Sequence, residues 1–292
     1  MSETGSGPSV FEKFKKKRVQ VGSTTIGPEA GVDPLPINDG PLDPLWAAWS
    51  VVGAWPVSFG LMMGAMAVTI PASVFVPFER VQRWGGAQLC GACLRATLSK
   101  VRVNYHPKFD KAQQSVYMMN HTSVLDAHAA LYAIPQPFCG IMFAHHFDIP
   151  VYGTLMKAAN GIGVERGGTK QTREVARQFR DRIDRGISIL GFPEGRRTQN
   201  GRILPFRSGL FRMSRDAGVP VVPLMVKGLW AVLPKREWIV RPGEIEIYVG
   251  PQIQTEGMDD KRLNTLAKQM QVLTADYVER GELGDVGALL DV

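Results

Sequence analysis

The amino-acid sequence predicts an α/β fold, in which a mostly parallel central sheet is flanked by helices and preceded by an N-terminal apolar two-helix element. After residue 78, short apolar runs alternate with polar, helix-compatible stretches. Residues 44–78 contain no charged side chain. Residues 1–43 are polar and rich in Gly and Pro, which predicts a disordered tail. The expected division is therefore a tail (1–43), an apolar helical hairpin (44–78) and one α/β domain (79–292).

Composition limits the class of protein. Hydrophobic residues make up 45% of the 292 residues, enough for a sizeable core. The net charge of +7 suits an anionic partner, namely a membrane surface, a phosphorylated substrate or nucleic acid. Three cysteines make no disulfide framework, which fits a reducing, cytoplasmic setting. Cys90 and Cys93 have C-x-x-C spacing, and we favour buried thiols over a redox or metal pair.

The tail holds a basic cluster, "FEKFKKKRV", which runs from Phe11 to Val19. One interpretation is a solvated run of charge. The other is a polybasic contact with anionic lipid, in which each cation contributes about 1 kcal/mol near the surface.

The uncharged stretch 44–78 is too long for one straight membrane span. As a single helix it would extend roughly 50 Å, against a hydrocarbon core of about 30 Å. Pro56 and Pro71 divide it, because proline breaks or kinks a helix. We expect a hairpin that enters one leaflet, with the tryptophans of its first half at the bilayer interface. The alternatives are a single tilted span over about 57–76 and a buried core hairpin of a soluble protein.

The α/β pattern after residue 78 predicts seven strands and two clear amphipathic helices. One helix covers 169–185, with Val175, Phe179 and Ile183 on its apolar face, and the other begins near Asp259. The strands are expected at 101–105, 115–119, 138–143, 162–165, 187–192, 219–226 and 245–249.

The stretch "NHTSVLD" places His121 and Asp126 five residues apart, about 140° apart on a regular helix. The two side chains meet only if the chain bends between them. We expect a strand ending at Asn120, a helix capped by Thr122 or Ser123, and Asp126 in the first helical turn. A carboxylate on one imidazole nitrogen raises the basicity of the other, which makes a general base for a hydroxyl. The alternative is a capped helix with a histidine nearby.

Two further loops carry arginine after an apolar strand. "GIGVERGGTK" contains Arg166, and "GFPEGRRTQNG" contains Arg196 and Arg197 beside Glu194. A guanidinium group binds phosphate with two parallel hydrogen bonds, and ligands gather at strand ends in such sheets. Taken singly, each loop is also compatible with a solvated turn.

Together, "NHTSVLD", "GIGVERGG", "FPEGRRT" and the apolar "VPVVPLMV" resemble the four motifs of the glycerolipid acyltransferases, the family of 1-acylglycerol-3-phosphate acyltransferase. Two departures are visible. Arg196 stands where the third motif usually has threonine, and His145 and His146 stand where many members carry a lysine. The resemblance implies that His121 and Asp126 are the catalytic pair. It implies a phosphate-binding set as well: Arg166, Glu194, Gly195 and Arg197.

The resemblance further implies acyl transfer from an acyl thioester, on coenzyme A or acyl carrier protein, to the free hydroxyl of lysophosphatidic acid, giving phosphatidic acid. The expected place is the cytoplasmic face of a cell membrane, where the protein is monotopic or anchored and meets anionic lipids. No metal, no other cofactor and no nucleic acid are expected. The alternatives are another acceptor (glycerol 3-phosphate, a lysophospholipid or a lyso-aminolipid) or a non-catalytic membrane lipid-binding protein.

Overall fold

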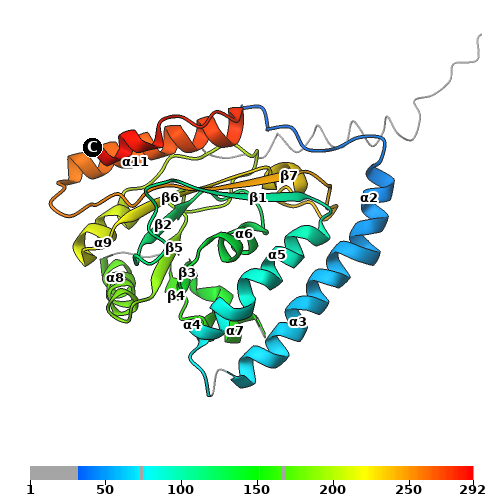
Figure 1. Cartoon of the computed structure of the whole chain (residues 1–292), viewed down its shortest axis with the longest axis horizontal. Helices are drawn as coiled ribbons and strands as arrows, with labels where there is room; N and C mark the ends of the chain where they lie inside the picture. The colour runs from blue at the N-terminus through cyan, green and yellow to red at the C-terminus, as the bar shows by residue number, and fades with distance from the viewer. Residues whose placement is uncertain (1–31, 73–74, 151, 166–168, 292) are drawn as a thin grey trace, which may run out of the picture.

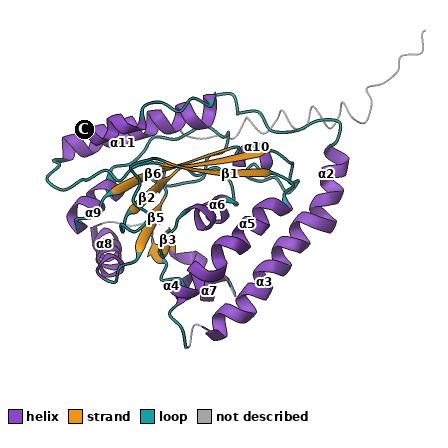
Figure 2. Cartoon of the chain, viewed as in Figure 1, coloured by secondary structure: helices purple, strands orange, loops and turns teal. Residues whose placement is uncertain are grey.

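The computed structural model describes residues 32–72, 75–150, 152–165 and 169–291. Within them, a seven-stranded sheet lies between two layers of helices (Figure 1, Figure 2). The strand order is β1-β7-β6-β2-β5-β3-β4, and every neighbouring pair is parallel except β6 with β7. The mostly parallel α/β sheet is therefore confirmed. The strands are β1 (Lys100–Tyr105), β2 (Val116–Met119), β3 (Phe138–Phe143), β4 (Ile162–Val164), β5 (Ser188–Gly191), β6 (Val221–Lys227) and β7 (Glu244–Val249).

Each face of the sheet buries its own apolar core. Along β2, Val116 and Met118 lie in one core, and Tyr117 and Met119 lie in the other. A strand buried on both faces reads as a continuous apolar run, which explains why the sequence located the strands. The first core is covered by α8 (Thr169–Asp184), α9 (Gly209–Ala217) and α11 (Asp260–Ala275). The second is covered by α5 (Ala87–Ala96), α6 (Asp126–Ala133) and α10 (Leu229–Val232).

Both predicted amphipathic helices are present. Val175, Phe179 and Ile183 of α8 are buried in the first core. Asp259 caps α11 by accepting a hydrogen bond from the backbone N–H of Arg262 at 2.8 Å. The shorter elements are η4 (Ala144–Asp148), α7 (Tyr152–Ala158), η5 (Asp276–Arg280) and η6 (Val286–Asp291).

The apolar stretch does not divide at Pro56, so the prediction of two apolar helices is wrong. The helix α2 (Asp43–Trp49), a π-helical turn η2 (Ser50–Ala54) and α3 (Trp55–Ala72) follow one another without a break. The backbone N–H of Trp55 bonds to the carbonyl of Ser50, a step of five residues. This wider turn comes just before Pro56, and the helix continues past a residue that has no N–H to donate.

The chain reverses after Ala72. The second arm comprises α4 (Phe78–Val81), η3 (Gln82–Gly86) and α5, and α5 packs along α3 (Figure 1). This arm contains charged residues, so it is not a second apolar helix. Cys90 and Cys93 of α5 are free and buried, and burial raises the pKa of Cys90 to about 12, as expected for structural thiols.

The apolar helix has one exposed side and one side attached to the α/β domain. Residues Asp43–Val68, with a mean hydropathy of 1.7, are long and apolar enough to cross a membrane by length and composition. On the attached side, the indole N–H of Trp49 donates to Ala96 O at 3.0 Å, and that of Trp55 donates to Trp238 O at 2.8 Å. The exposed side includes Leu45, Val51, Val52, Phe59, Met63 and Val68.

A buried ion pair fixes the start of this helix. The guanidinium of Arg241 is fully buried and donates to both carboxylate oxygens of Asp43, at 3.0 and 3.3 Å. Nearby, the backbone N–H of Val240 donates to Ser50 Oγ at 2.8 Å. A buried charge needs such a partner, so the helix and the domain depend on each other.

The residues just before the helix also contact the domain. The backbone N–H of Leu35 donates to Asn200 O at 2.7 Å, and the indole N–H of Trp230 donates to Leu35 O at 3.0 Å. The last part of the expected tail therefore lies on the α/β domain. The basic cluster from Phe11 to Val19 lies outside the described residues.

Candidate active site

The topology brings several sequence motifs to one edge of the sheet. The strands β2, β5, β3 and β4 are neighbours and run parallel, so their carboxyl ends meet at the same edge. His121 follows β2, His146 follows β3 and Glu194 follows β5. This edge is where α/β sheets bind ligands.

His121 and Asp126 are in contact, as the chain-bend hypothesis requires. Nδ1 of His121 lies 2.7 Å from Oδ2 of Asp126. The Asp126 side chain is 1% exposed and the His121 side chain is 27% exposed. Because a carboxylate only accepts, the neutral imidazole carries its proton on Nδ1 and has its lone pair on Nε2, which is the form of a general base.

The local backbone differs from the expected capped helix. Helix α6 begins at Asp126 itself, and neither Thr122 nor Ser123 caps it. Instead, Asp126 Oδ2 accepts the backbone N–H of Thr122 at 2.8 Å and that of Ser123 at 3.1 Å. The hydroxyl of Ser123 is engaged elsewhere, donating to Leu233 O at 2.8 Å. Asp126 therefore closes the turn and orients His121 with the same oxygen.

Glu194 holds the backbone of the same turn. Its Oε1 accepts the backbone N–H of His121 at 2.7 Å, and its Oε2 accepts that of Leu204 at 2.9 Å. The Glu194 side chain is 2% exposed. A buried carboxylate would repel a phosphate, so within the predicted phosphate-binding set Glu194 fits the role of bracing the arginine loop while Arg166 and Arg197 hold the phosphate.

Gly195 and Phe192 shape the turn that carries Glu194. Gly195 has a φ of +73°, a left-handed conformation that favours glycine, and its N–H donates to Phe192 O at 2.9 Å. The Phe192 ring stacks on the His121 ring, with centroids 3.9 Å apart. Sequence reasoning did not single out Phe192, although an aromatic residue at the end of a strand in this motif was a usable signal.

Arg197 lies within electrostatic reach of His146. Burial lowers the pKa of His146, and the charges of His145 and Arg197 lower it further. The carbonyl of Arg197 accepts a hydrogen bond from Lys235 Nζ at 3.2 Å, a contact that the sequence did not indicate. The next residue, Thr198, donates its backbone N–H to His121 O at 2.9 Å, so the loop that carries Arg197 adjoins the His121 turn. Arg166 lies outside the described residues, and β4 ends two residues before it.

No group of three or more His, Cys, Asp or Glu side chains is arranged to hold a metal ion within the described part of the chain.

Comparison with known proteins shows which proteins the α/β domain resembles. Residues 100–227 match the family model described as Acyltransferase, and this range contains the His121 turn and both arginine loops. Over this range the chain is similar to the acyltransferase family.

Among curated relatives, it is 25% identical over 173 residues to a 1-acyl-sn-glycerol-3-phosphate acyltransferase of Cocos nucifera, covering 58% of this chain and 55% of that one. It is 29% identical over 163 residues to a chloroplastic enzyme of the same description from Brassica napus, covering 54% of this chain and 47% of that one. The chain thus spans about half the length of these relatives. Among solved structures, the 1-acyl-sn-glycerophosphate acyltransferase of Thermotoga maritima is similar, with a TM-score of 0.64 and 18% identity. That match covers 81% of this chain and 94% of the other, and it supports the fold.

Proposed function

We propose that the protein is an O-acyltransferase that moves an acyl group from an acyl thioester to the free hydroxyl of lysophosphatidic acid. The observation that carries the proposal is the 2.7 Å contact between His121 Nδ1 and Asp126 Oδ2, next to the loop that carries Arg197. A pure binding protein does not need an oriented base. Both relatives are described as 1-acyl-sn-glycerol-3-phosphate acyltransferases, which supports lysophosphatidic acid as the acceptor.

In the proposed reaction, His121 Nε2 takes the proton of the acceptor hydroxyl as its oxygen attacks the thioester carbonyl carbon. The carbon–sulfur bond then breaks, and the imidazolium returns its proton to the leaving thiolate. Asp126 stabilises the transient positive charge on His121 and keeps the proton on Nδ1. A thioester is already activated for acyl transfer, so the mechanism requires no metal. It requires no cofactor besides the acyl donor, which is the thioester of coenzyme A or of acyl carrier protein.

We assign the binding of the acceptor's phosphate group to the arginine loops. Arg197 is the described member of this set, and Arg166 is assigned to it from its motif. Gly195 contributes by allowing the turn between Glu194 and Arg197. Charge-assisted hydrogen bonds to phosphate are each worth about 1.5–3 kcal/mol, enough to select a phosphorylated acceptor.

We further propose that the protein is monotopic, with its apolar helix in the cytoplasmic leaflet. The helix is attached to the domain at Trp49, Ser50 and Trp55, so a transverse span would carry domain surface into hydrocarbon. A unique cysteine at residue 25, in a variant lacking the three native cysteines, tests this arrangement. On sealed, right-side-out vesicles, an impermeant thiol reagent should label that cysteine only after lysis, and labelling of intact vesicles would contradict it.

The activity test uses purified full-length protein in mixed vesicles with long-chain acyl-CoA or acyl-acyl carrier protein. Product lipids are identified by mass spectrometry, with His121→Ala as the matched control. Phosphatidic acid should form from lysophosphatidic acid, and the His121→Ala variant should form none above background. Absence of product with both donors would contradict the proposal.

The alternative acceptors belong in the same assay, because one observation favours them. His146 lies within electrostatic reach of Arg197, and its ring centroid is 4.3 Å from that of His145; many family members carry a lysine at this place. Faster acylation of glycerol 3-phosphate, a lysophospholipid or a lyso-aminolipid would replace lysophosphatidic acid as the acceptor and leave the chemistry unchanged.

A further inference from the structure

The segment 200–206 connects the arginine loop to α9 without regular secondary structure, and two carboxylates hold it. The backbone N–H of Ile203 donates to Glu279 Oε1 at 2.9 Å. The next N–H, that of Leu204, donates to Glu194 Oε2 at 2.9 Å. Glu194 is also the residue whose other oxygen accepts the N–H of His121. A continuous series of contacts therefore runs from Glu279 to the backbone of the proposed base.

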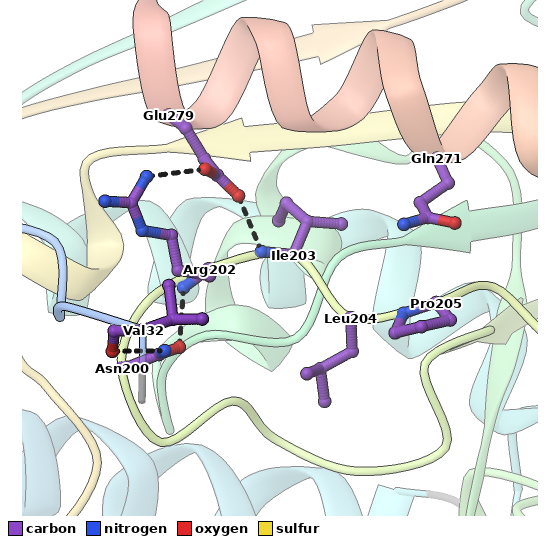
Figure 3. A pocket seen from close by; sticks show the side chains of 8 residues that line it. All are labelled: Val32, Asn200, Arg202, Ile203, Leu204, Pro205, Gln271 and Glu279. Atoms are coloured by element: carbon purple, nitrogen blue, oxygen red, sulfur yellow. Dashed lines mark hydrogen bonds and ion pairs between the residues drawn. The ribbon is translucent and has the colours of Figure 1, made fainter. Parts of the chain in front are cut away.

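Glu279 reaches this segment from the far end of the chain. It lies in η5, the π-helical turn that extends α11, and its side chain is 16% exposed. Its second oxygen accepts from Arg202 Nη1 at 2.9 Å (Figure 3). One carboxylate thus binds two consecutive residues of the 200–206 segment, a side chain and a backbone N–H.

Ile203 and Leu204 are buried, but one face of the segment borders open space. A cavity of about 340 Å³ lies beside the segment, lined on one side by Arg202 to Pro205 and on the other by Gln271 and Glu279 (Figure 3). Space on that side lets the segment shift if its hydrogen bonds are lost. Asn200 Oδ1 accepts the N–H of Arg202 at 3.1 Å, and the Glu279 contact holds the next N–H, so Glu279 helps to set the direction of the Ile203 peptide and, through it, that of the adjacent Leu204 N–H.

We infer that Glu279 is a positioning residue for acyl transfer. By fixing Ile203, it aims the Leu204 N–H at Glu194, and Glu194 in turn holds the backbone of His121. The inference rests on the proposed role of His121 as the base. Glu279 lies outside the family-matched range 100–227, and none of the predicted motifs contains it.

The first test compares Glu279→Ala, Glu279→Gln and Glu282→Gln in the vesicle assay. Glu279→Ala should lower kcat about tenfold and change KM for the acyl donor less than twofold, because the substrates do not touch this residue. Glu279→Gln retains an oxygen for the Ile203 N–H and should recover most of kcat. Glu282, exposed and three residues further on, is the control, and its variant should behave as wild type. An unchanged kcat in Glu279→Ala would overturn the inference.

The second test asks whether the effect passes through Glu194. In a Glu194→Gln background, adding Glu279→Ala should lower kcat by less than about twofold, because the contact through which it acts is already weakened. A full tenfold loss in that background would show an independent route and contradict the inference.

The third test does not depend on turnover. Hydrogen–deuterium exchange in Glu279→Ala should speed up in peptides covering Ile203 to Phe206 and covering Met119 to Thr122, while α8 stays protected. Faster exchange confined to the first peptide would overturn the coupling. If exchange behaves as expected but His121→Ala remains active, the coupling stands and the proposed function fails, so the two outcomes are distinguishable.

Discussion

Replacing Asp126 with asparagine removes a charge from beside His121 and leaves an acceptor oxygen in its place. Asp126 Oδ2 accepts from three donors: His121 Nδ1 at 2.7 Å, Thr122 N at 2.8 Å and Ser123 N at 3.1 Å. An asparagine NH₂ in that position would face two backbone N–H groups, so the side chain must present its carbonyl oxygen there instead. His121 then keeps its proton on Nδ1, and Nε2 remains the base.

The size of the effect follows from the lost charge. A hydrogen bond to a charged group contributes about 1.5–3 kcal/mol, and a neutral one about 0.5–1.5 kcal/mol. The difference, about 1–1.5 kcal/mol, acts on the transition state, where His121 carries a positive charge. At about 1.36 kcal/mol per factor of ten, Asp126→Asn should lower kcat roughly tenfold.

The assay measures kcat at saturating donor and acceptor for wild type, Asp126→Asn and His121→Ala, with thermal unfolding as the control for folding. His121→Ala should lose a factor of about 10²–10⁴, because it removes the base itself. The asparagine variant should therefore lie well above the His121→Ala variant. If the two lose activity equally while both remain folded, the shared acceptor oxygen does not preserve the tautomer, and the reasoning is wrong.

Three further predictions concern the base, the acceptor and pH. His121→Ala should leave the melting temperature within a few degrees of wild type, because the ring is partly exposed; a large drop would assign His121 a structural role. Arg197→Ala and Arg166→Ala should each raise KM for a phosphorylated acceptor about tenfold and KM for the donor much less, as measured by initial rates; equal effects would place these arginines on the donor. Burial lowers the pKa of His128 below its ordinary value of about 6.5, and its buried Nδ1 has no hydrogen-bond partner among the described residues. The unfolded chain therefore binds a proton below pH 6.5 that the folded chain does not, so the free energy of unfolding should fall as pH decreases from 6.5, and His128→Leu should flatten that slope in urea titrations.

The central strands β2, β5 and β6 could be predicted from sequence because they are buried on both faces of the sheet. A run such as "SVYMM" has only one stable environment when every side chain in it is covered. The contact between His121 and Asp126 was also predictable, because a strand end followed by a turn lets the chain fold back. Neither conclusion required knowledge of distant contacts.

The features that escaped prediction depend on such contacts. Whether Pro56 ends a helix depends on the π-helical turn before it, and the attachment of Trp49 and Trp55 to the domain holds that helix in place. The role of Glu194 is set by Leu204 and His121, which come from two different loops. Side chains of this kind resemble ordinary loop residues until the fold brings their partners to them.

The ion pair between Asp43 and Arg241 determines how this protein can be made water-soluble. A shortened gene starting at residue 79 would remove Asp43, to which Arg241 donates twice, and leave the guanidinium only the longer ion pair with Glu237 at 3.7 Å; breaking a buried pair of this kind costs about 3–5 kcal/mol. That cost is a large part of the 5–15 kcal/mol by which domains are usually stable, and the same cut uncovers the core that Ala54 helps to close. Truncation should therefore yield aggregated protein. A soluble form is better sought by keeping the whole helix and replacing its exposed residues, such as Val52, Phe59 and Val68, with polar ones.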